Sequence, residues 1–516
     1  MSASPRWSGA LELSLVAALG AAQTLAFVHT GYWPVPLLAA ALLAWRVGRA
    51  TTGRAAWLGY AYGTAWIAAG TWWLFISMHR YGDLPAWLAA LAVFALASFV
   101  SLFLAGAMAF VARCRPAGPL ASAAVFAAVW LLAELARGVV FTGFPWLASG
   151  YAQVDSPLGG FASWVGVYGV GAIGAGVAAA FGFSSLGRAR AWLGPSLALL
   201  AAIVLGSVAG SVDFTKPTGT VTLSLLQGNV PQDEKFEGRF AIAALEQTRQ
   251  QIDGAHGDLV IGPETVIPML PSQLDPAWWQ GVLARFRQPG RFAILGLPLG
   301  DEDTGYTNSA AGISAASQAL PGGFYRYDKH HLVPFGEFIP TGFHWFTRLM
   351  NIPLGDFNRG PVTAPSFDVM GERVAPNICY EDLFGEELAA RFVPEATAPT
   401  ILVNISNIGW FGETIAVAQH LQISRMRTLE LQRPMVRATN TGATAVINHL
   451  GVVTASLPPF QRGVLETSVQ GRIGTTPFAW WAARVDLWPL LVIGLLPSVW
   501  AFARRRRPAS AARSHL

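Results

Sequence analysis

The chain has 516 residues, of which 53% are hydrophobic and only 13% are charged, and its net charge is +5. Soluble domains carry about 25% charged residues, so a large part of this chain is expected to lie in lipid. The small positive charge resides mostly in short loops between apolar stretches, which argues against a nucleic-acid partner.

Eight apolar stretches predict membrane-spanning helices, because most of them approach the ~20 residues that cross a bilayer. They lie at Leu11–Val28, Trp33–Trp45, Ala55–Ile76, Trp87–Ala112, Leu120–Val140, Gly160–Leu186, Trp192–Val212 and Leu487–Phe502. The segment between the seventh and the eighth stretch has an ordinary soluble composition. We therefore expect a membrane domain at 1–212, a soluble domain at 213–484, and an eighth helix with a basic tail at 485–516.

The arginines predict how the chain is oriented, because every second connection between the apolar stretches is basic. The basic connections contain Arg46, Arg49 and Arg54, then Arg113 and Arg115, then Arg188 and Arg190, and finally Arg504–Arg507. Since cytoplasmic loops carry the excess of Lys and Arg, both termini are expected in the cytoplasm and the soluble domain on the opposite side. Cys114 and Cys379 would then lie on opposite sides of the membrane and could not pair.

Two charged residues interrupt the fifth apolar stretch. Glu134 and Arg137 lie three residues apart, so they can neutralise each other on one helix face. Charge inside a membrane suggests function. Arg137 is near the end of the stretch, however, and extension of its side chain to the interface explains it equally well.

Residues 213–484 predict a layered α/β domain, in which short apolar strands alternate with helices. The strands are expected at Val221–Leu226, Leu259–Ile261, Phe292–Leu297, Phe324–Tyr327, Arg373–Ile378, Ile401–Ile405, Met435–Ala438 and Ala443–Asn448. Helices are expected at Phe240–Ile252, 382–392 and 415–432. Several strands are almost entirely apolar, which indicates that both faces of the sheets are covered.

Three reactive side chains each follow one of these strands: Glu264, Lys329 and Cys379. Sites in α/β proteins gather at the carboxyl ends of strands. A carboxylate can take a thiol proton, the thiolate can attack a carbonyl, and an ammonium can stabilise the oxyanion. A helix start after Cys379 would favour the thiolate. The alternative is that Cys379 is a buried structural cysteine and that the two charged residues lie on the surface.

Three motifs resemble those of the nitrilase superfamily. They are Pro263-Glu264, Lys329 with the following Leu332-Val-Pro-Phe-Gly-Glu337-Phe-Ile-Pro340, and Cys379-Tyr380-Glu381. With the expected spans, the chain resembles the apolipoprotein N-acyltransferases of the bacterial inner membrane, and Gln227–Gln232 and Phe141–Trp146 also match that family. The resemblance implies an αββα sandwich on the periplasmic side. It also implies transfer of a phospholipid acyl chain to the α-amino group of a diacylglyceryl-cysteine lipoprotein.

The same resemblance implies the roles of the reactive residues. Cys379 would be the nucleophile and carry the acyl group as a thioester, so that the two substrates react in turn. Glu264 would be the general base and Lys329 would stabilise the oxyanion. Glu337 would orient Lys329.

Further residues are expected to support the pocket or to contact lipid. Tyr380 and Glu381 would support the pocket. The candidate substrate-binding residues are Phe236, Trp345, Phe346, Trp410 and Phe411. Phe236 stands where the family often has Trp, and the others lie in apolar loops whose packing onto the domain core is an equal alternative.

Other classes of protein share part of this pattern. A membrane-tethered nitrilase-type amidase or hydrolase would use the same three residues with water as the acyl acceptor. A transporter or scaffold is disfavoured, because the spans hold few ionisable residues. His330 and His331 are adjacent, and no pattern of metal ligands surrounds them. We therefore expect no metal, no cofactor and a monomeric protein.

Overall fold

A computed structural model describes residues 9–185, 189–233, 238–340, 342 and 356–505. The chain forms two compact units. Unit 1 comprises Met1–Trp72, Ala90–Val212 and Leu487–Leu516, and unit 2 comprises Trp73–Ala89 and Asp213–Asp486. The expected membrane domain at 1–212 stays a prediction, and in the structure Trp73–Ala89 forms one compact unit with Asp213–Asp486.

Unit 1 is helical. Its helices are α1 (Gly9–Ala22), α2 (Thr24–Val28), α3 (Pro34–Val47), α4 (Thr52–Thr71), α6 (Ala86–Cys114), α7 (Pro119–Val139), α8 (Ala162–Gly182), α9 (Leu193–Gly210) and α16 (Trp488–Arg505). Helix α8 packs against α3, α7 and α9, and α16 packs against α7. The many Gly and Ala residues of α8 allow its three neighbouring helices to approach closely.

Five helices of the described chain are long and apolar enough to cross a membrane. They lie at Gly9–Val28, Ala86–Cys114, Pro119–Thr142, Pro157–Gly182 and Arg190–Gly210. Helix α15 (Pro477–Val485) together with α16 makes a sixth if this bent pair is one span. The predicted count of eight also included α3 and α4. Both form as helices, but α3 has only 14 residues and α4 contains Arg54 and several small or polar residues.

The charged pair of the fifth apolar stretch lies inside unit 1. Arg137 Nη2 is 3.1 Å from Glu134 Oε1, and both side chains are buried. Arg137 also donates to the Leu147 carbonyl, and Ser149 donates its backbone N–H to Glu134 at 2.7 Å. The pair therefore joins α7 to the segment that follows it, and Arg137 does not extend along the surface of the bundle.

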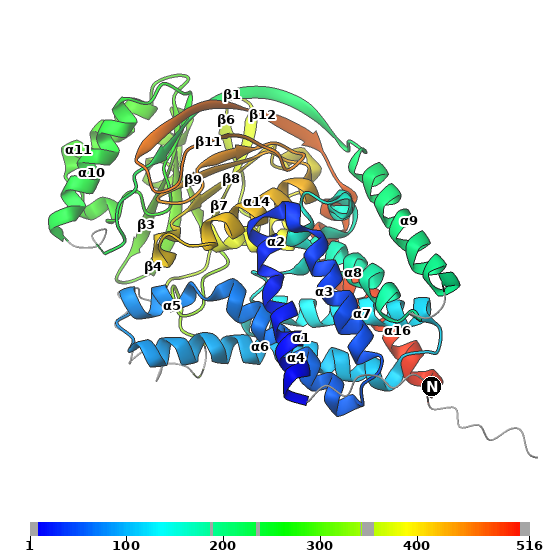
Figure 1. Ribbon diagram of the computed structural model, residues 1–516. Helices are drawn as coiled ribbons and strands as arrows, with labels where there is room; N and C mark the ends of the chain where they lie inside the picture. Colours follow the sequence, from blue (N-terminus) through cyan, green and yellow to red (C-terminus); the bar gives the residue numbers. More distant parts are fainter. Residues whose placement is uncertain (1–8, 186–188, 234–237, 341, 343–355, 506–516) are drawn as a thin grey trace, which may run out of the picture. The chain divides into compact units, whose positions relative to one another are not determined.

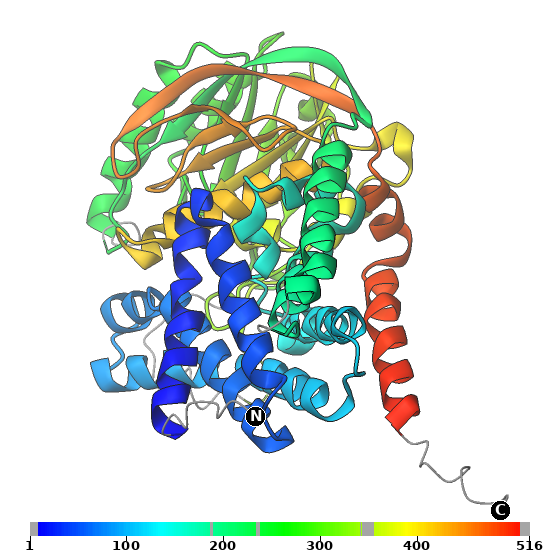
Figure 2. The ribbon, with the colours of Figure 1, turned by 45° about the vertical axis from the view of Figure 1, so that its right-hand side comes forward.

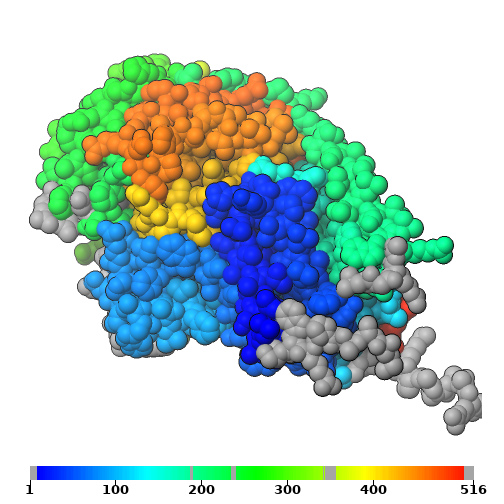
Figure 3. All heavy atoms as spheres, in the orientation of Figure 1, coloured from blue at the N-terminus to red at the C-terminus, as the bar shows by residue number. Residues whose placement is uncertain are grey.

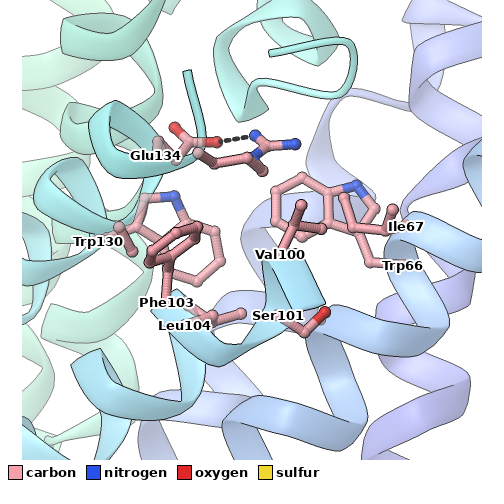
Figure 4. A pocket seen from close by; sticks show the side chains of 11 residues that line it. Trp66, Ile67, Val100, Ser101, Phe103, Leu104, Trp130 and Glu134 are labelled. Carbon is pink, nitrogen blue, oxygen red and sulfur yellow. Dashed lines mark hydrogen bonds and ion pairs between the residues drawn. The ribbon is translucent and has the colours of Figure 1, made fainter. Parts of the chain in front are cut away.

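A small hollow lies beside this pair. It encloses about 310 Å³ of empty space, part of it open to the outside. Figure 4 shows the indole rings of Trp66 and Trp130 beside it, with Phe103 and Leu104 below and Glu134 at its polar end. The ring centroids of Trp66 and Trp130 are 5.9 Å apart and the rings are stacked. Aromatic packing thus fills most of the space around the charged pair.

Unit 2 contains two six-stranded sheets. The first has the order β12-β1-β2-β3-β4-β5 and the second β11-β10-β9-β8-β7-β6. The strands are β1 (Thr215–Gln227), β2 (Leu259–Ile261), β3 (Phe292–Asp301), β4 (Gly305–Ile313), β5 (Tyr325–Asp328), β6 (Phe367–Val369), β7 (Glu372–Ile378), β8 (Ile401–Ser406), β9 (Met435–Thr439), β10 (Ala445–Ile447), β11 (Val453–Ser456) and β12 (Gly463–Gly474). In each sheet the central strands are parallel and the outer pairs are antiparallel.

The two sheets pack face to face. Their shared core contains Leu223, Ile261 and Ile294 of the first sheet and Val374, Val403 and Val436 of the second. Strands β1 and β12 form a long antiparallel pair at one edge, which Figures 1 and 2 both show. In Figure 3 the orange residues of β11 and β12 cover a continuous face of the unit.

Helices cover the outer faces of both sheets, so the predicted αββα sandwich is confirmed. On the first sheet, α10 (Gly238–Asp253) and α11 (Pro276–Phe286) lie side by side and contribute Ile252 and Phe286 to the outer core. On the second sheet, α13 (Gly385–Ala390), α14 (Ala416–Leu431) and α15 supply Leu388, Leu431 and Phe478. The reactive residues are carried by the loops that leave this rigid frame.

Candidate active site

Glu264, Lys329 and Glu337 form a buried charge cluster at the ends of the first sheet. Glu264 follows β2 and Lys329 follows β5 directly. Lys329 Nζ lies 2.9 Å from the nearest oxygens of Glu337 and 3.3 Å from Oε1 of Glu264. All three side chains are buried. The ammonium is therefore held between two carboxylates, one of which belongs to Glu337.

The carboxylate of Glu264 is held in place from both sides. Its Oε2 accepts the backbone N–H of Asn407 at 2.9 Å, at the end of β8. Its Oε1 accepts a hydrogen bond from the amide of Asn308 at 2.7 Å. Hydrogen bonds to a charged acceptor are stronger than those between neutral groups, so this carboxylate has little freedom to turn.

Asn308 of β4 is a site residue that the sequence analysis missed. Its Nδ2 donates to Glu264 at 2.7 Å and to Glu337 Oε1 at 2.6 Å. Its backbone carbonyl accepts the N–H of Lys329 at 2.9 Å. Asn308 thus joins all three charged residues, while its own Oδ1 has no partner within the described part of the chain.

Replacing Asn308 by alanine should reduce turnover about tenfold or more, because two carboxylates lose the donor that sets their separation. Each hydrogen bond to a charged group contributes about 1.5–3 kcal/mol, so the thermal midpoint should also fall. Activity assays and thermal unfolding of the detergent-solubilised protein measure both effects. Asn358→Ala is the matched control, because this exposed amide donates to the Thr304 carbonyl and does not contact the cluster. Equal turnover in the two variants would refute this role of Asn308.

Cys379 directly follows β7 and is the first residue of a 3₁₀ turn, Cys379–Leu383. Its backbone has φ = 53°, a left-handed conformation that non-glycine residues rarely adopt. Its side chain is partly buried and packs near Ile408 and Val417. Such strained residues occur often at functional sites, because the surrounding contacts hold them there.

The electrostatics of Cys379 differ from the prediction that a helix start would favour the thiolate. Burial raises the pKa of the Cys379 thiol well above its ordinary value, and the negative charge of Glu264 raises it further. The Lys329 ammonium acts in the opposite direction and does not compensate. The turn after Cys379 has only five residues, so its dipole is small compared with the cost of burying a charge. Cys379 therefore rests as a thiol, and forming its thiolate would require a base.

Lys329 has the opposite balance. Burial alone would lower the pKa of its ammonium, but the charges of Glu337 and Glu264 outweigh burial and raise the pKa above its ordinary value. The side chain therefore remains a cation at neutral pH, which suits the stabilisation of an oxyanion.

Glu381 holds together the loops that carry Lys329 and Cys379. Its Oε2 accepts from the Tyr327 hydroxyl at 2.8 Å and from the Ile378 backbone N–H at 2.6 Å. Its Oε1 accepts the backbone N–H groups of His330 at 2.7 Å and of His331 at 3.3 Å. The two histidines are thus engaged by their backbones.

Tyr380 is buried and lies against two rings. The His331 ring centroid is 5.7 Å from its own, and the Phe384 centroid is 5.4 Å away in an edge-on arrangement. His331 Nδ1 is 2.8 Å from a carboxylate oxygen of Glu387. Tyr380 therefore packs within the turn that begins at Cys379, and His331 is part of that packing.

The structure describes only two of the five candidate lipid-contacting residues. Phe236, Trp345 and Phe346 lie outside the described residues. Trp410 and Phe411 form a 3₁₀ turn, Ile408–Phe411, and both are half-buried. They pack against Trp73–Ala89. The Phe411 ring lies 4.2 Å from the Trp73 ring, and the Trp410 ring lies 5.7 Å from the Tyr81 ring.

The segment Trp73–Ala89 contacts residues that lie close to the site in the chain. Trp73 Nε1 donates to Gln419 Oε1 of α14 at 3.0 Å, and its ring packs on Phe411. Phe411 belongs to the turn that begins one residue after Asn407, whose N–H binds Glu264. The residues between α4 and α6 are thus packed against the loop whose Asn407 N–H binds Glu264.

The fold and the site together define a class of protein. Two six-stranded sheets lie face to face between helical layers, and Glu264, Lys329 and Cys379 follow strands of these sheets. The family model "Carbon-nitrogen hydrolase" matches residues 231–478, and "Apolipoprotein N-acyltransferase N-terminal domain" matches residues 19–180.

Full-length relatives then decide the family. The chain is 49% identical to the apolipoprotein N-acyltransferase of Verminephrobacter eiseniae, over 99% of each chain. It is 46% identical to that of Ralstonia nicotianae, over 96% of this chain and 94% of the relative. A solved carbon-nitrogen hydrolase of Helicobacter pylori is 17% identical, with a TM-score of 0.33, and the match covers 53% of this chain and 94% of that chain. The protein belongs to the apolipoprotein N-acyltransferase family, a family of inner-membrane acyltransferases.

Proposed function

We propose that the protein transfers an acyl chain from a phospholipid to the N-terminal α-amino group of a diacylglyceryl-cysteine lipoprotein, through a thioester on Cys379. The observation that carries this proposal is the buried Glu264–Lys329–Glu337 cluster, whose charges act on the Cys379 thiol. The names of the full-length relatives supply the substrate class.

The first half of the reaction loads the enzyme. Glu264 takes the proton of the Cys379 thiol, and the thiolate attacks the carbonyl carbon of the phospholipid ester. The negative charge that develops on the carbonyl oxygen faces the Lys329 ammonium. The C–O bond then breaks, Glu264 returns its proton to the leaving oxygen, and a lysophospholipid departs. The acyl group remains on sulfur.

The second half unloads it. The neutral α-amine of the lipoprotein attacks the thioester, and Glu264 takes a proton from nitrogen. The C–S bond breaks, the amide is released, and the proton returns to Cys379. An α-amine has a pKa of about 8, so part of it is neutral at pH 7. Two sequential steps let two large lipid substrates use one cysteine.

The proposal is tested with the purified full chain in phosphatidylethanolamine vesicles and a synthetic diacylglyceryl-cysteine peptide. Mass spectrometry should find one acyl group added to the α-amine, and lysophospholipid should appear in equal amount. Release of free fatty acid with an unmodified peptide would instead support the hydrolase, in which water takes the acyl group.

We also propose that unit 2 faces the periplasm, because the basic connections mark the opposite ends of the helices as cytoplasmic. Asp303→Cys and Gly53→Cys place thiols at two exposed positions, one in the turn before β4 and one at the start of α4. Both changes are made in a chain with Cys114→Ser and Cys379→Ser. A membrane-impermeant maleimide on intact spheroplasts should label only the Asp303→Cys chain. Labelling of only the Gly53→Cys chain would reverse the orientation.

A further inference from the structure

A second polar cluster lies behind the nucleophile, and the acyl-transfer steps above do not use it. It consists of Asp382 from the turn after β7, His420 and Ser424 from α14, and Arg437 from β9. None of these side chains has any solvent exposure. Burying a carboxylate and a guanidinium is costly even when they are paired, so the cluster calls for a functional reason.

The hydrogen bonds of the cluster determine where the His420 proton lies. Arg437 Nη2 is 3.0 Å from His420 Nδ1, and a guanidinium can only donate. Nδ1 is therefore the acceptor, and the proton of the neutral ring lies on Nε2. Asp382 accepts from this Nε2 at 3.0 Å, and its other oxygen accepts from Arg437 Nη1 at 3.2 Å. Ser424 also donates to Asp382. Every acceptor in the cluster thus faces a donor.

The same Nε2 proton also faces the nucleophile. The backbone carbonyl oxygen of Cys379 lies 3.3 Å from His420 Nε2, and Asn404 Nδ2 donates to that carbonyl at 3.2 Å. On the other side of Cys379, the N–H of Ile378 is held by Glu381. The left-handed residue is therefore fixed by side-chain hydrogen bonds both before and after it.

We propose that His420 is a positioning residue for the nucleophile: its Nε2 proton, aimed by Asp382 and Arg437, fixes the Cys379 carbonyl and keeps Sγ within reach of Glu264. The proposal deepens the acyl-transfer function and rests on Cys379 being its nucleophile. Five charged groups surround the thiol, namely Glu264, Lys329, Glu337, Asp382 and Arg437. Asp382 and Arg437 neutralise each other, so the cluster can act on position without adding net charge.

Two amide substitutions test the roles of the two ring nitrogens of His420 separately. In His420→Gln the amide nitrogen reaches about where Nε2 stood and can still donate to the Cys379 carbonyl. In His420→Asn the shorter amide replaces Nδ1, so it can accept from Arg437 but does not reach Cys379. Both variants keep a polar amide in the cluster, which makes them matched controls for each other.

The measurement is the pre-steady-state burst of p-nitrophenolate when the full chain reacts with a short p-nitrophenyl ester. This burst reports acylation of Cys379 whichever lipid is the natural donor, so its outcome is independent of the substrate assignment. We expect His420→Gln to retain the burst rate within about threefold and His420→Asn to lower it about 10- to 100-fold, the size of effect that a small misplacement produces. The ester concentration at half-maximal rate should change little in either variant.

Alkylation by iodoacetamide supplies a readout that separates position from charge. The pH midpoint of Cys379 alkylation should stay the same in both His420 variants, because no charge is removed. Asp382→Asn should shift it to lower pH, since the Asp382 carboxylate raises the pKa of the thiol. Equal burst rates in the Gln and Asn variants, or a faster rate in the Asn variant, would overturn the proposal, as would a shifted alkylation midpoint in His420→Asn.

Discussion

Cys379→Ala should abolish both the acyl-enzyme and the N-acylated product. Incubation of the wild-type protein with phospholipid alone should add the mass of one acyl chain to the peptide that contains Cys379, and neutral hydroxylamine should remove it. The alanine variant offers no nucleophile for the ester carbon, so no adduct can form. Intact-mass and peptide mass spectrometry measure the adduct, and acylation of the diacylglyceryl peptide measures the product.

The chain carries its own control for this experiment. Cys114 is the second free cysteine, and it is buried in a small cluster with Val125 and Ala501 of unit 1. Cys114→Ala should therefore keep the adduct and the product at wild-type levels. Full-rate acylation of the peptide by an enzyme that never carries an acyl group would exclude the thioester route, even if Cys379→Ala is inactive for another reason.

The residues that sequence reasoning found are those that follow strands recognisable from short apolar or aromatic runs. Strand β2 has the predicted bounds, Leu259–Ile261, and the ends of β5 and β7 lie within one residue of their predicted positions. Strands β2 and β7 are buried almost throughout, so hydrophobicity marks where they end, whereas β5 buries only its two tyrosines and exposes Arg326. Lys329 and Cys379 come directly after the ends of β5 and β7, Glu264 comes three residues after the end of β2, and the fold brings Glu264 and Lys329 into contact.

Asn308 was missed because its strand has no such signal. Strand β4 consists largely of small and polar residues, and Tyr306 is its only aromatic residue. It is nevertheless buried, because it pairs with β3 and β5 on either side. Tertiary pairing can place a weak strand former in the middle of a sheet. A single sequence therefore does not reveal that this asparagine faces two carboxylates.

The segment after α4 was missed for a different reason. The apolar stretch Ala55–Ile76 predicted one helix, but α4 ends at Thr71 and Trp73 instead packs on Phe411 of unit 2. The contact joins residues more than 300 positions apart, and the indole N–H is satisfied by Gln419. Hydropathy does not distinguish an aromatic residue facing lipid from one packed against a distant loop.

Glu264→Gln should change acyl transfer and the alkylation of Cys379 in opposite directions. Loss of the base should lower acyl transfer by about 10²- to 10⁴-fold, the range that a positioned general base contributes. The amide retains the size of the side chain and one acceptor oxygen for the donors Asn407 and Asn308, so the fold should persist. Steady-state acylation of the diacylglyceryl peptide and thermal unfolding measure these two expectations.

The thiol should respond in the opposite direction. After burial, the charge of Glu264 is the largest cause of the raised pKa of Cys379, and removing it lowers that pKa while the Lys329 cation remains. A lower pKa means a larger thiolate fraction at a given pH, so iodoacetamide should alkylate Cys379 faster in Glu264→Gln than in the wild type. Glu264→Asp keeps the charge and should leave the pH midpoint of alkylation near the wild-type value, although its shorter side chain slows transfer. If alkylation and transfer both slow in Glu264→Gln, the carboxylate supports the site structurally and another group takes the thiol proton. If alkylation accelerates while transfer collapses, Glu264 is the base, because a more ionised nucleophile then fails only for want of a group that moves protons.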